Sequence, residues 1–258
     1  MPARVLIKLG GTLLDTAESR RTLSREIAAA SMGDLRTVVV HGGGKQMTRF
    51  LAERGIESRF VNGLRVTTPE VLDAVLKVLA GSVNQELVSA LAAAGAQPVG
   101  LTGVDALLTE AEPLSAELGA VGRPVRSNAR LLELLTANGY LPVVACVAGD
   151  RDGRIYNVNA DQMAVACASA FGAGRLFFLT DVDGVRGAQG QILSDLSISG
   201  MESLVRDGIA TGGMRAKLEA ARKALEDGVG EVVIAPGALP GIVGKLLTGE
   251  LTGTRLHR

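Results

Sequence analysis

A short apolar run that ends in three glycines constrains the fold of this chain more than any other stretch. Residues 38–40 are consecutive valines, and His41 and the glycines at 42–44 follow them. β-Branched residues in a row predict a buried strand, which the glycines end abruptly. Because glycine has no Cβ, several backbone N–H groups can face one small concavity that suits an anion. The helical spacing of residues 45–54 adds a helix N-terminus, whose positive end favours negative charge.

Composition indicates an ordinary globular protein. The 258 residues carry 27 basic and 27 acidic side chains, so the formal net charge is zero. The dispersed lysines and arginines argue against nucleic acid as the main partner, and no apolar stretch reaches the roughly 18 residues of a membrane span. Residues 1–4 lack the layout of a signal peptide. Cys146 and Cys167 both lie in apolar runs. We therefore expect a cytoplasmic protein, outside the membrane, with buried and unpaired thiols.

Strands and helices alternate along the whole chain. Buried strands are predicted at 5–9, 36–41, 97–102, 141–148, 175–180 and 231–235. Helices are predicted at 15–32, 45–54, 69–94, 131–135, 159–171, 199–207, 212–227 and 239–247, with short strands and an irregular loop over 105–126. Apolar strands joined by helices predict a three-layer α/β/α sandwich with a mainly parallel sheet. We expect one domain over 1–258, with an N-terminal lobe of about 1–150 and a C-terminal lobe of about 151–258. The two lobes share the sheet, and a ligand cleft is expected above the strand ends.

Residues 58–67 interrupt the alternation. Asn62-Gly63 between two short apolar runs is a strong hairpin signal, and it predicts an inserted flap. Thr68 as N-cap and Pro69 as first helical residue then begin a long helix that reaches about residue 94. Gly81 in the middle of this helix costs about 1 kcal/mol relative to Ala, which is tolerable where something packs closely, such as another subunit.

Two common nucleotide-binding motifs are missing from the sequence. The P-loop pattern fails because Leu246 follows Gly244-Lys245. The dinucleotide pattern Gly-x-Gly-x-x-Gly fails because Met47 stands where its last glycine belongs. These departures disfavour a P-loop enzyme and a Rossmann dehydrogenase.

Several polar residues stand where strands end or helices begin. Lys8 lies in an apolar strand that breaks at two glycines, and a lysine there is costly unless its ammonium group reaches a partner. Asn159 is the expected cap of an apolar helix, with Asp161 in its first turn. Lys217 follows two glycines at the start of another helix. Taken singly, each feature also fits a snorkelling lysine or an ordinary helix cap.

Taken in order, these motifs resemble the amino acid kinase family. The matching segments are Lys8-Leu9-Gly10-Gly11, His41-Gly42-Gly43-Gly44, Asn62-Gly63-Leu64-Arg65-Val66-Thr67, Asn157-Val158-Asn159-Ala160-Asp161, Asp181-Val182-Asp183-Gly184-Val185 and Gly212-Gly213-Met214-x-x-Lys217. The resemblance covers nearly the whole chain and implies the amino acid kinase fold. Within the family, the sequence is most similar to members that use ATP to phosphorylate the side-chain carboxylate of N-acetyl-L-glutamate. This reaction gives N-acetyl-L-glutamyl 5-phosphate in the second step of arginine biosynthesis.

The resemblance implies roles for the charged and glycine-rich motifs. Lys8 and Lys217 would stabilise the transition state of phosphoryl transfer, and Asp161 between them would keep both charged and oriented. Substrate would be bound by the Gly43 and Gly44 N–H groups, by Arg65 as a bidentate fork on the α-carboxylate, and by Asn157.

By the same resemblance, ATP is the co-substrate. Its binding residues would be Gly10, Gly11, Thr180, Asp181, Val182, Asp183, Gly184, Val185, Ile209, Ala210 and Thr211. Mg²⁺ would ride on the phosphates, as this cation prefers, and no protein metal ligand is assigned.

Two alternatives stay open within this fold. One is a kinase for another acidic substrate, such as aminoadipate or its carrier-linked form, because one methylene is worth only about 1–3 kcal/mol of discrimination. The other is an amino acid sensor without catalysis, which the loss of Lys8, Asp161 or Lys217 would favour; all three are present.

The broad apolar stripe of the helix at 69–94 predicts a two-fold interface and hence a homodimer. Arginine-inhibited members of the family carry an extra N-terminal helix that links dimers into a ring. Here four residues precede the first predicted strand, too few for a helix. We therefore expect activity that does not respond to arginine.

Overall fold

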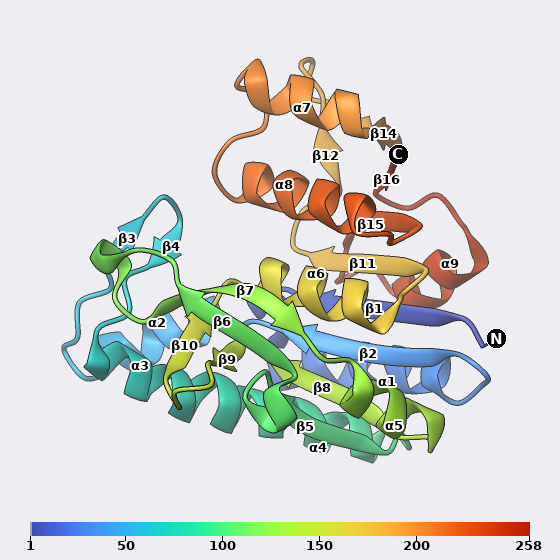
Figure 1. Ribbon diagram of the computed structural model, residues 1–258. Helices are drawn as coiled ribbons and strands as arrows, with labels where there is room; N and C mark the ends of the chain where they lie inside the picture. Colours follow the sequence, from blue (N-terminus) through green and yellow to red (C-terminus); the bar gives the residue numbers. More distant parts are fainter. Residues whose placement is uncertain (1) are drawn as a thin grey trace.

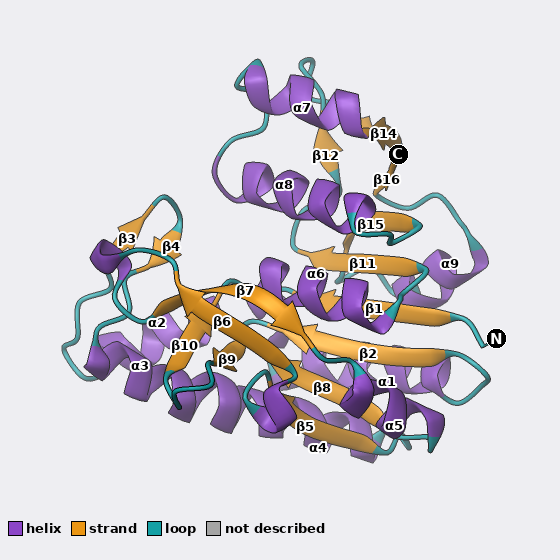
Figure 2. Ribbon diagram, in the orientation of Figure 1, coloured by secondary structure: helices purple, strands orange, loops and turns teal. Residues whose placement is uncertain are grey.

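An eight-stranded sheet runs through the whole molecule (Figures 1 and 2). The computed structural model describes residues 2–258. Across the sheet the strands are β14 (Asp195–Ser197), β16 (Thr254–His257), β15 (Glu231–Pro236), β11 (Arg175–Thr180), β1 (Arg4–Leu9), β2 (Arg36–His41), β8 (Leu141–Ala145) and β5 (Pro98–Thr102). Every neighbouring pair is parallel except β15 and β16. The predicted sandwich with a mainly parallel sheet is confirmed, and strands from both halves of the chain share that sheet.

Helices cover both faces of the sheet, as the alternation predicts. One face carries α1 (Ala17–Ser31), the long helix described below and α9 (Ile242–Thr248). The other carries α5 (Arg130–Ala137), α6 (Ala160–Phe171) and α8 (Gly212–Glu226), with α7 (Ile198–Arg206) packed on α8. In Figure 1, α6 lies in front of the central strands, with α8 beside it. The valines at 38–40 are fully buried between these layers.

A small closed barrel adjoins the sheet, and the sequence reasoning missed it. It consists of β6 (Thr109–Pro113), β7 (Val121–Ser127), β9 (Val147–Gly149) and β10 (Ile155–Val158). The predicted strand 141–148 is divided at Cys146, so that β8 stays in the main sheet while β9 turns away to pair with β10. Continuous apolarity hides this division, because a buried strand in either sheet has the same pattern.

The flap and the long helix agree with their predicted positions. β3 (Phe60–Val61) and β4 (Leu64–Arg65) form the hairpin, with positive φ angles of 49° at Asn62 and 78° at Gly63. Such a two-residue turn needs left-handed backbone, which Asn-Gly supplies. The helix then runs as α3 (Pro69–Val75), a π-helical stretch η2 (Leu76–Val83) and α4 (Asn84–Ala93). Thr68 caps it by accepting a hydrogen bond from the Val71 N–H, and Pro69 is its first residue.

Within residues 2–258, no side chain packs closely against Gly81. A Cβ there would meet only the Leu76 carbonyl of the same helix, at 3.5 Å. The glycine therefore stays available for contact outside the chain.

The remaining elements are short. They are η1 (Gly11–Leu14), α2 (Gly44–Ala52), η3 (Asp105–Leu107), η4 (Ala116–Leu118), β12 (Val185–Arg186) and β13 (Ile192–Leu193). Cys146 and Cys167 are buried and unpaired, as predicted. Across residues 2–258, no helix combines the length and apolarity needed to cross a membrane.

Candidate active site

Asp161 lies between two lysines from opposite halves of the chain. The Lys8 ammonium, at the end of β1, is 2.6 Å from Asp161 Oδ1. The Lys217 ammonium, on α8, is 3.4 Å from Oδ2. Asp161 itself is placed by the capping predicted for Asn159, whose side-chain oxygen accepts hydrogen bonds from the N–H groups of residues 161 and 162. The strand lysine therefore has the partner that its burial requires.

The three side chains carry a net positive charge in a nearly dry environment. The side chains of Lys8 and Asp161 are each 7% exposed, and that of Lys217 is 18% exposed. Burial alone would raise the pKa of Asp161, but the two ammonium groups outweigh it and hold the pKa below its ordinary value. Asp161 thus stays ionised, and one positive charge of the trio remains to attract an anion.

Two glycine loops face each other beside this trio. A Cβ on Gly11 would lie 3.0 Å from the Gly44 nitrogen, so the loops can approach only because this position lacks a side chain. Gln46 joins them, since its side-chain amide donates to the Gly11 carbonyl over 3.0 Å. Gly44 begins α2, and its N–H therefore has no acceptor within the helix.

A cavity of about 280 Å³ brings all seven predicted catalytic and substrate residues together. It is lined by Lys8, Gly11, Gly42, Gly43, Gly44, Met47, Phe60, Gly63, Leu64, Arg65, Val75, Leu79, Val121, Cys146, Asn157, Val158, Asn159, Ala160, Asp161 and Lys217. The flap supplies one wall and the trio another, so a ligand there meets both halves of the chain.

Arg65 reaches the cavity from the flap with much of its guanidinium already in use. Its Nη2 donates to the Gly44 carbonyl at 3.2 Å and to Thr48 Oγ1 at 2.8 Å, and its Nη1 donates to Ser58 Oγ. The guanidinium carbon also lies 4.6 Å from the centre of the Phe60 ring. Burial lowers the pKa of Arg65, yet from so high a value that the group stays charged at neutral pH.

Asn157 stands on β10 and faces the cavity. Its amide donates to Thr67 Oγ1 over 3.1 Å, and the Thr67 hydroxyl donates in turn to the Arg65 carbonyl over 2.9 Å. Thr67 is fully buried. The barrel and the flap are therefore linked through one hydroxyl group.

Of the eleven residues predicted for the nucleotide, Gly11 lines this cavity and the other ten lie outside it. Thr180 ends β11, next to Gly10, whose N–H donates to the Leu179 carbonyl at 2.9 Å. Residues 181–183 are exposed, and Thr211 is the N-cap of α8. Two of the predicted residues, Val185 and Ala210, belong to the core. Their buried side chains leave only backbone atoms to meet a ligand.

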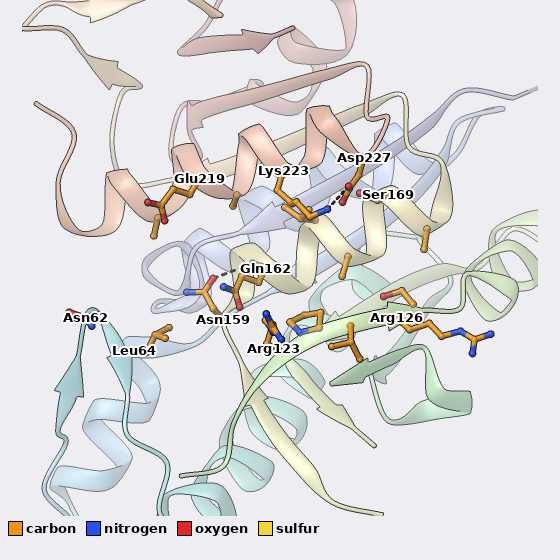
Figure 3. Close-up of a pocket in the computed structure, with 18 residues that line it drawn as sticks. Asn62, Leu64, Arg123, Arg126, Asn159, Gln162, Ser169, Glu219, Lys223 and Asp227 are labelled. Carbon is orange, nitrogen blue, oxygen red and sulfur yellow. Dashed lines mark hydrogen bonds and ion pairs between the residues drawn. The ribbon is translucent and has the colours of Figure 1, made fainter. Parts of the chain in front are cut away.

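Larger hollows lie beside the candidate site. One of about 600 Å³ runs between α6, α8 and β7, as Figure 3 shows. Asn62 and Leu64 of the flap stand at one end of it, while Lys223 and Asp227 at the other end pair with each other. Another, of about 550 Å³, is lined by Lys45 and Arg49, among others. Neither contains the trio, so size does not identify the site here.

The sequence reasoning overlooked several residues around the glycine loops. His41 is fully buried at the end of β2 and bonds to Asn84 of the long helix, which is 2% exposed. An asparagine among the apolar positions of a helix signals a buried hydrogen bond, and this signal could have found it. Gln46 and Thr67 carry no comparable signal, because their partners come from distant parts of the chain.

The sheet topology, the two glycine loops and the lysine–aspartate–lysine trio define a phosphotransferase of the amino acid kinase type. A sequence profile of the amino acid kinase family matches residues 3–236, and the chain belongs to that family.

Individual members of the family also match the chain closely. The chain is 63% identical to an acetylglutamate kinase of Solibacter usitatus over 98% of each chain. It is 41% identical to an acetylglutamate kinase of Bartonella quintana, over 97% of this chain and 88% of that one. Among solved structures, smu.665 from Streptococcus mutans is similar with a TM-score of 0.84 and 28% identity, covering 100% of this chain and 99% of that one.

Proposed function

We propose that this chain transfers the γ-phosphoryl group of ATP to the side-chain carboxylate of N-acetyl-L-glutamate. The product is N-acetyl-L-glutamyl 5-phosphate, and the reaction is the second step of arginine biosynthesis. The observation that carries the proposal is the contact of Asp161 with both Lys8 and Lys217 beside two glycine loops. Membership of the family and the 63% identity to an acetylglutamate kinase support it.

The chemistry needs charge stabilisation more than proton transfer. A carboxylate is already an ionised nucleophile at neutral pH, so no general base is required. Negative charge spreads over the oxygens of the moving phosphoryl group, and positioned cations lower the energy of that state. Lys8 and Lys217 supply these cations from opposite halves of the chain, and Asp161 holds the two ammonium groups in place.

Acetylglutamate binding falls to the flap and the glycine loops. The N–H groups of Gly43 and Gly44 bind the substrate anions, and Asn157 bonds to the α-carboxylate or the amide. Arg65 binds the α-carboxylate through two parallel hydrogen bonds. Both hydrogens of its Nη2 are used by Gly44 and Thr48, so a bidentate grip requires at least one of these bonds to be exchanged. Substrate binding therefore changes the contacts between the Arg65 guanidinium and α2.

ATP binds to the C-terminal lobe of about 151–258, while the lobe of about 1–150 binds acetylglutamate. Gly10 and Gly11 approach the phosphates, and residues 180–185 and 209–211 line adenine and ribose. Val185 and Ala210 contribute backbone atoms, because their side chains are buried.

Mg²⁺ enters with the phosphates of ATP and neutralises part of their charge. Both Asp161 oxygens face ammonium groups, so this carboxylate is not free for a cation. No group of three or more His, Cys, Asp or Glu side chains within 2–258 is arranged to hold a metal ion. The donors that fit Mg²⁺ here are phosphate oxygens and water, which this cation retains readily.

The protein works as a homodimer that uses the long helix. Leu72, Leu76 and Ala80 are spaced at i, i+4 and i+8 and are only half-buried, next to the partnerless Gly81. An apolar stripe of this kind on one helix suits a two-fold contact with a second copy.

ATP turnover with a panel of acceptors tests the function. The panel contains acetylglutamate, glutamate, aspartate, aminoadipate and UMP, with acyl phosphate formation as the readout. Acetylglutamate should be the preferred acceptor. Preference for aminoadipate would identify the homologous kinase instead. Ligand binding without turnover would identify a sensor.

A further inference from the structure

His41 is buried between the sheet and the long helix, with both ring nitrogens occupied. Nδ1 lies 3.0 Å from the Gly42 carbonyl oxygen, and Nε2 lies 2.9 Å from the Asn84 side-chain nitrogen. The ring is fully buried. It does not line the 280 Å³ cavity, although the three glycines that follow it do.

The partners fix the tautomer of the ring. A carbonyl only accepts, so Nδ1 must carry the hydrogen that it donates to Gly42. The Asn84 nitrogen also donates to the Val143 carbonyl over 3.0 Å, which orients its amide and points its second N–H at Nε2. Asn84 in turn needs Gly100, where a Cβ would overlap its Oδ1. The network therefore selects a neutral ring with its hydrogen on Nδ1.

The ring does not act as a charge. Burial lowers the pKa of His41 to about 4, although the bond to Gly42 works in the other direction. Leu9 and His41 are paired in the sheet, so His41 faces the side opposite to that of Lys8, the residue before Leu9. A neutral imidazole on the far face neither contacts an anion in the cavity nor repels the two lysines.

Its bond to Gly42 sets the direction of the Gly43 N–H. In a trans peptide the carbonyl of Gly42 and the N–H of Gly43 point in opposite directions. A peptide between two glycines can rotate at little steric cost, so the sequence alone does not fix that direction. We propose that His41 is a positioning residue, which holds the Gly42 carbonyl and thereby aims the Gly43 N–H group into the cavity. This inference rests on the proposed function, in which that amide binds the substrate.

Imidazole ¹⁵N NMR on the intact protein tests the tautomer without a substitution at the site. The chain has only two histidines, and His257→Gln removes the exposed one, which pairs with Asp195. The remaining signals should show hydrogen on Nδ1 and no titration between about pH 5 and 8. A ring with its hydrogen on Nε2, or one that titrates near neutrality, overturns the proposal.

Two substitutions then separate positioning from packing. His41→Asn keeps an N–H near the place of Nδ1, whereas His41→Leu fills the space without a donor. For His41→Leu, we expect kcat/KM for acetylglutamate to fall on the order of 10-fold to 100-fold, as for a slightly misplaced catalytic group. His41→Asn should recover most of this loss. Equal activity of His41→Leu and wild type, or equal losses in two variants of equal stability, would contradict positioning.

Failure of the proposed function and failure of the His41 proposal can be told apart. If the wild type fails to phosphorylate acetylglutamate, the proposed function fails while the spectrum still reports the tautomer. If His41→Leu does not fold, two measurements still test the proposal. One is the imidazole ¹⁵N spectrum, and the other is the shift of the Gly43 amide signal when acetylglutamate is added to the His41→Asn protein. A Gly43 amide signal that does not respond to acetylglutamate counts against the proposal.

Discussion

Gly43 and Leu79 pack so closely that no side chain fits between them. A Cβ on Gly43 would overlap Leu79 Cδ2, and Val83 Cγ2 would lie 3.5 Å away. Leu79 and Val83 belong to η2 and are each 4% exposed. The long helix thus holds the glycine loop at 42–44 in two ways: Leu79 and Val83 pack against Gly43, and Asn84 bonds to His41.

The two neighbouring glycines should respond differently to alanine. Gly43→Ala overpacks the contact with Leu79 and should lower the free energy of unfolding by about 1–3 kcal/mol. Gly44→Ala meets nothing within 4 Å, so its stability should change by less than about 0.5 kcal/mol while its KM for acetylglutamate rises. Urea denaturation and steady-state kinetics measure both. The double variant Gly43→Ala/Leu79→Ala should show no further stability penalty from the alanine at 43 relative to Leu79→Ala alone.

Lys217→Met should lower kcat far more than it alters substrate binding. The ammonium group is needed mainly as charge develops on the phosphoryl group, and losing one such stabiliser costs on the order of 10²–10³ in rate. Lys223 on the same helix is exposed and pairs with Asp227, so Lys223→Met is the matched control. A Lys217→Met enzyme within about threefold of wild type would remove Lys217 from the mechanism.

Asp161→Asn should reveal a pH-dependent part of the stability. Because the folded pKa of Asp161 is depressed, the ionised carboxylate stabilises the fold above its ordinary pKa of 3.8. That stabilisation is lost as the pH falls through the lower folded value. The free energy of unfolding of the wild type should therefore exceed that of Asp161→Asn by about 3 kcal/mol or more at neutral pH. This difference should shrink below about pH 4. Urea denaturation between pH 7 and 3 measures this, and a difference that stays constant with pH would contradict the assigned ion pairs.

Much of the fold could be predicted because local signals agreed with it. The strand at 175–180 and the Asn62-Gly63 turn each rest on patterns within ten residues, and both are confirmed. β16 and the barrel were missed, because they depend on pairing between strands far apart in the sequence. The division at Cys146 is of the same kind, since the apolar run gives no sign of which sheet each part joins.

In the candidate site, too, contacts between distant segments could not be predicted from the sequence. The sequence indicates that Lys8 needs an anionic partner, and the resemblance to the family names Asp161, which the structure places 2.6 Å away. The existing bonds of Arg65 to Thr48 and Ser58 are invisible in the sequence, because no motif marks a serine or threonine as a partner for an arginine. Hydrogen bonds of this type appear only once the flap and α2 are folded against each other.

Arg65→Ala should raise the KM for acetylglutamate strongly while leaving that for ATP nearly unchanged. The guanidinium stands at the cavity between the flap and α2, away from residues 180–185. Arg65→Lys should not restore binding, because a point charge cannot make a planar fork. Thr48→Ala is the control, since it removes one existing bond of Arg65 and keeps the guanidinium. Equal losses for both substrates would indicate a general folding defect in place of a binding role.

Leu76→Glu should convert the proposed dimer to monomers without unfolding them. Leu76 lies on the half-buried stripe of the long helix, so the new carboxylate can reach water in a monomer but is desolvated in the two-fold contact. Light scattering of the wild type should give the mass of two protomers and that of Leu76→Glu the mass of one, with helical content preserved in circular dichroism. Lys77→Glu is the matched control, because the neighbouring Lys77 is exposed and pairs with Asp73 on its own helix. A wild type that scatters as one protomer, or as six, would contradict the dimer. A Leu76→Glu protein that stays dimeric would move the interface to another face.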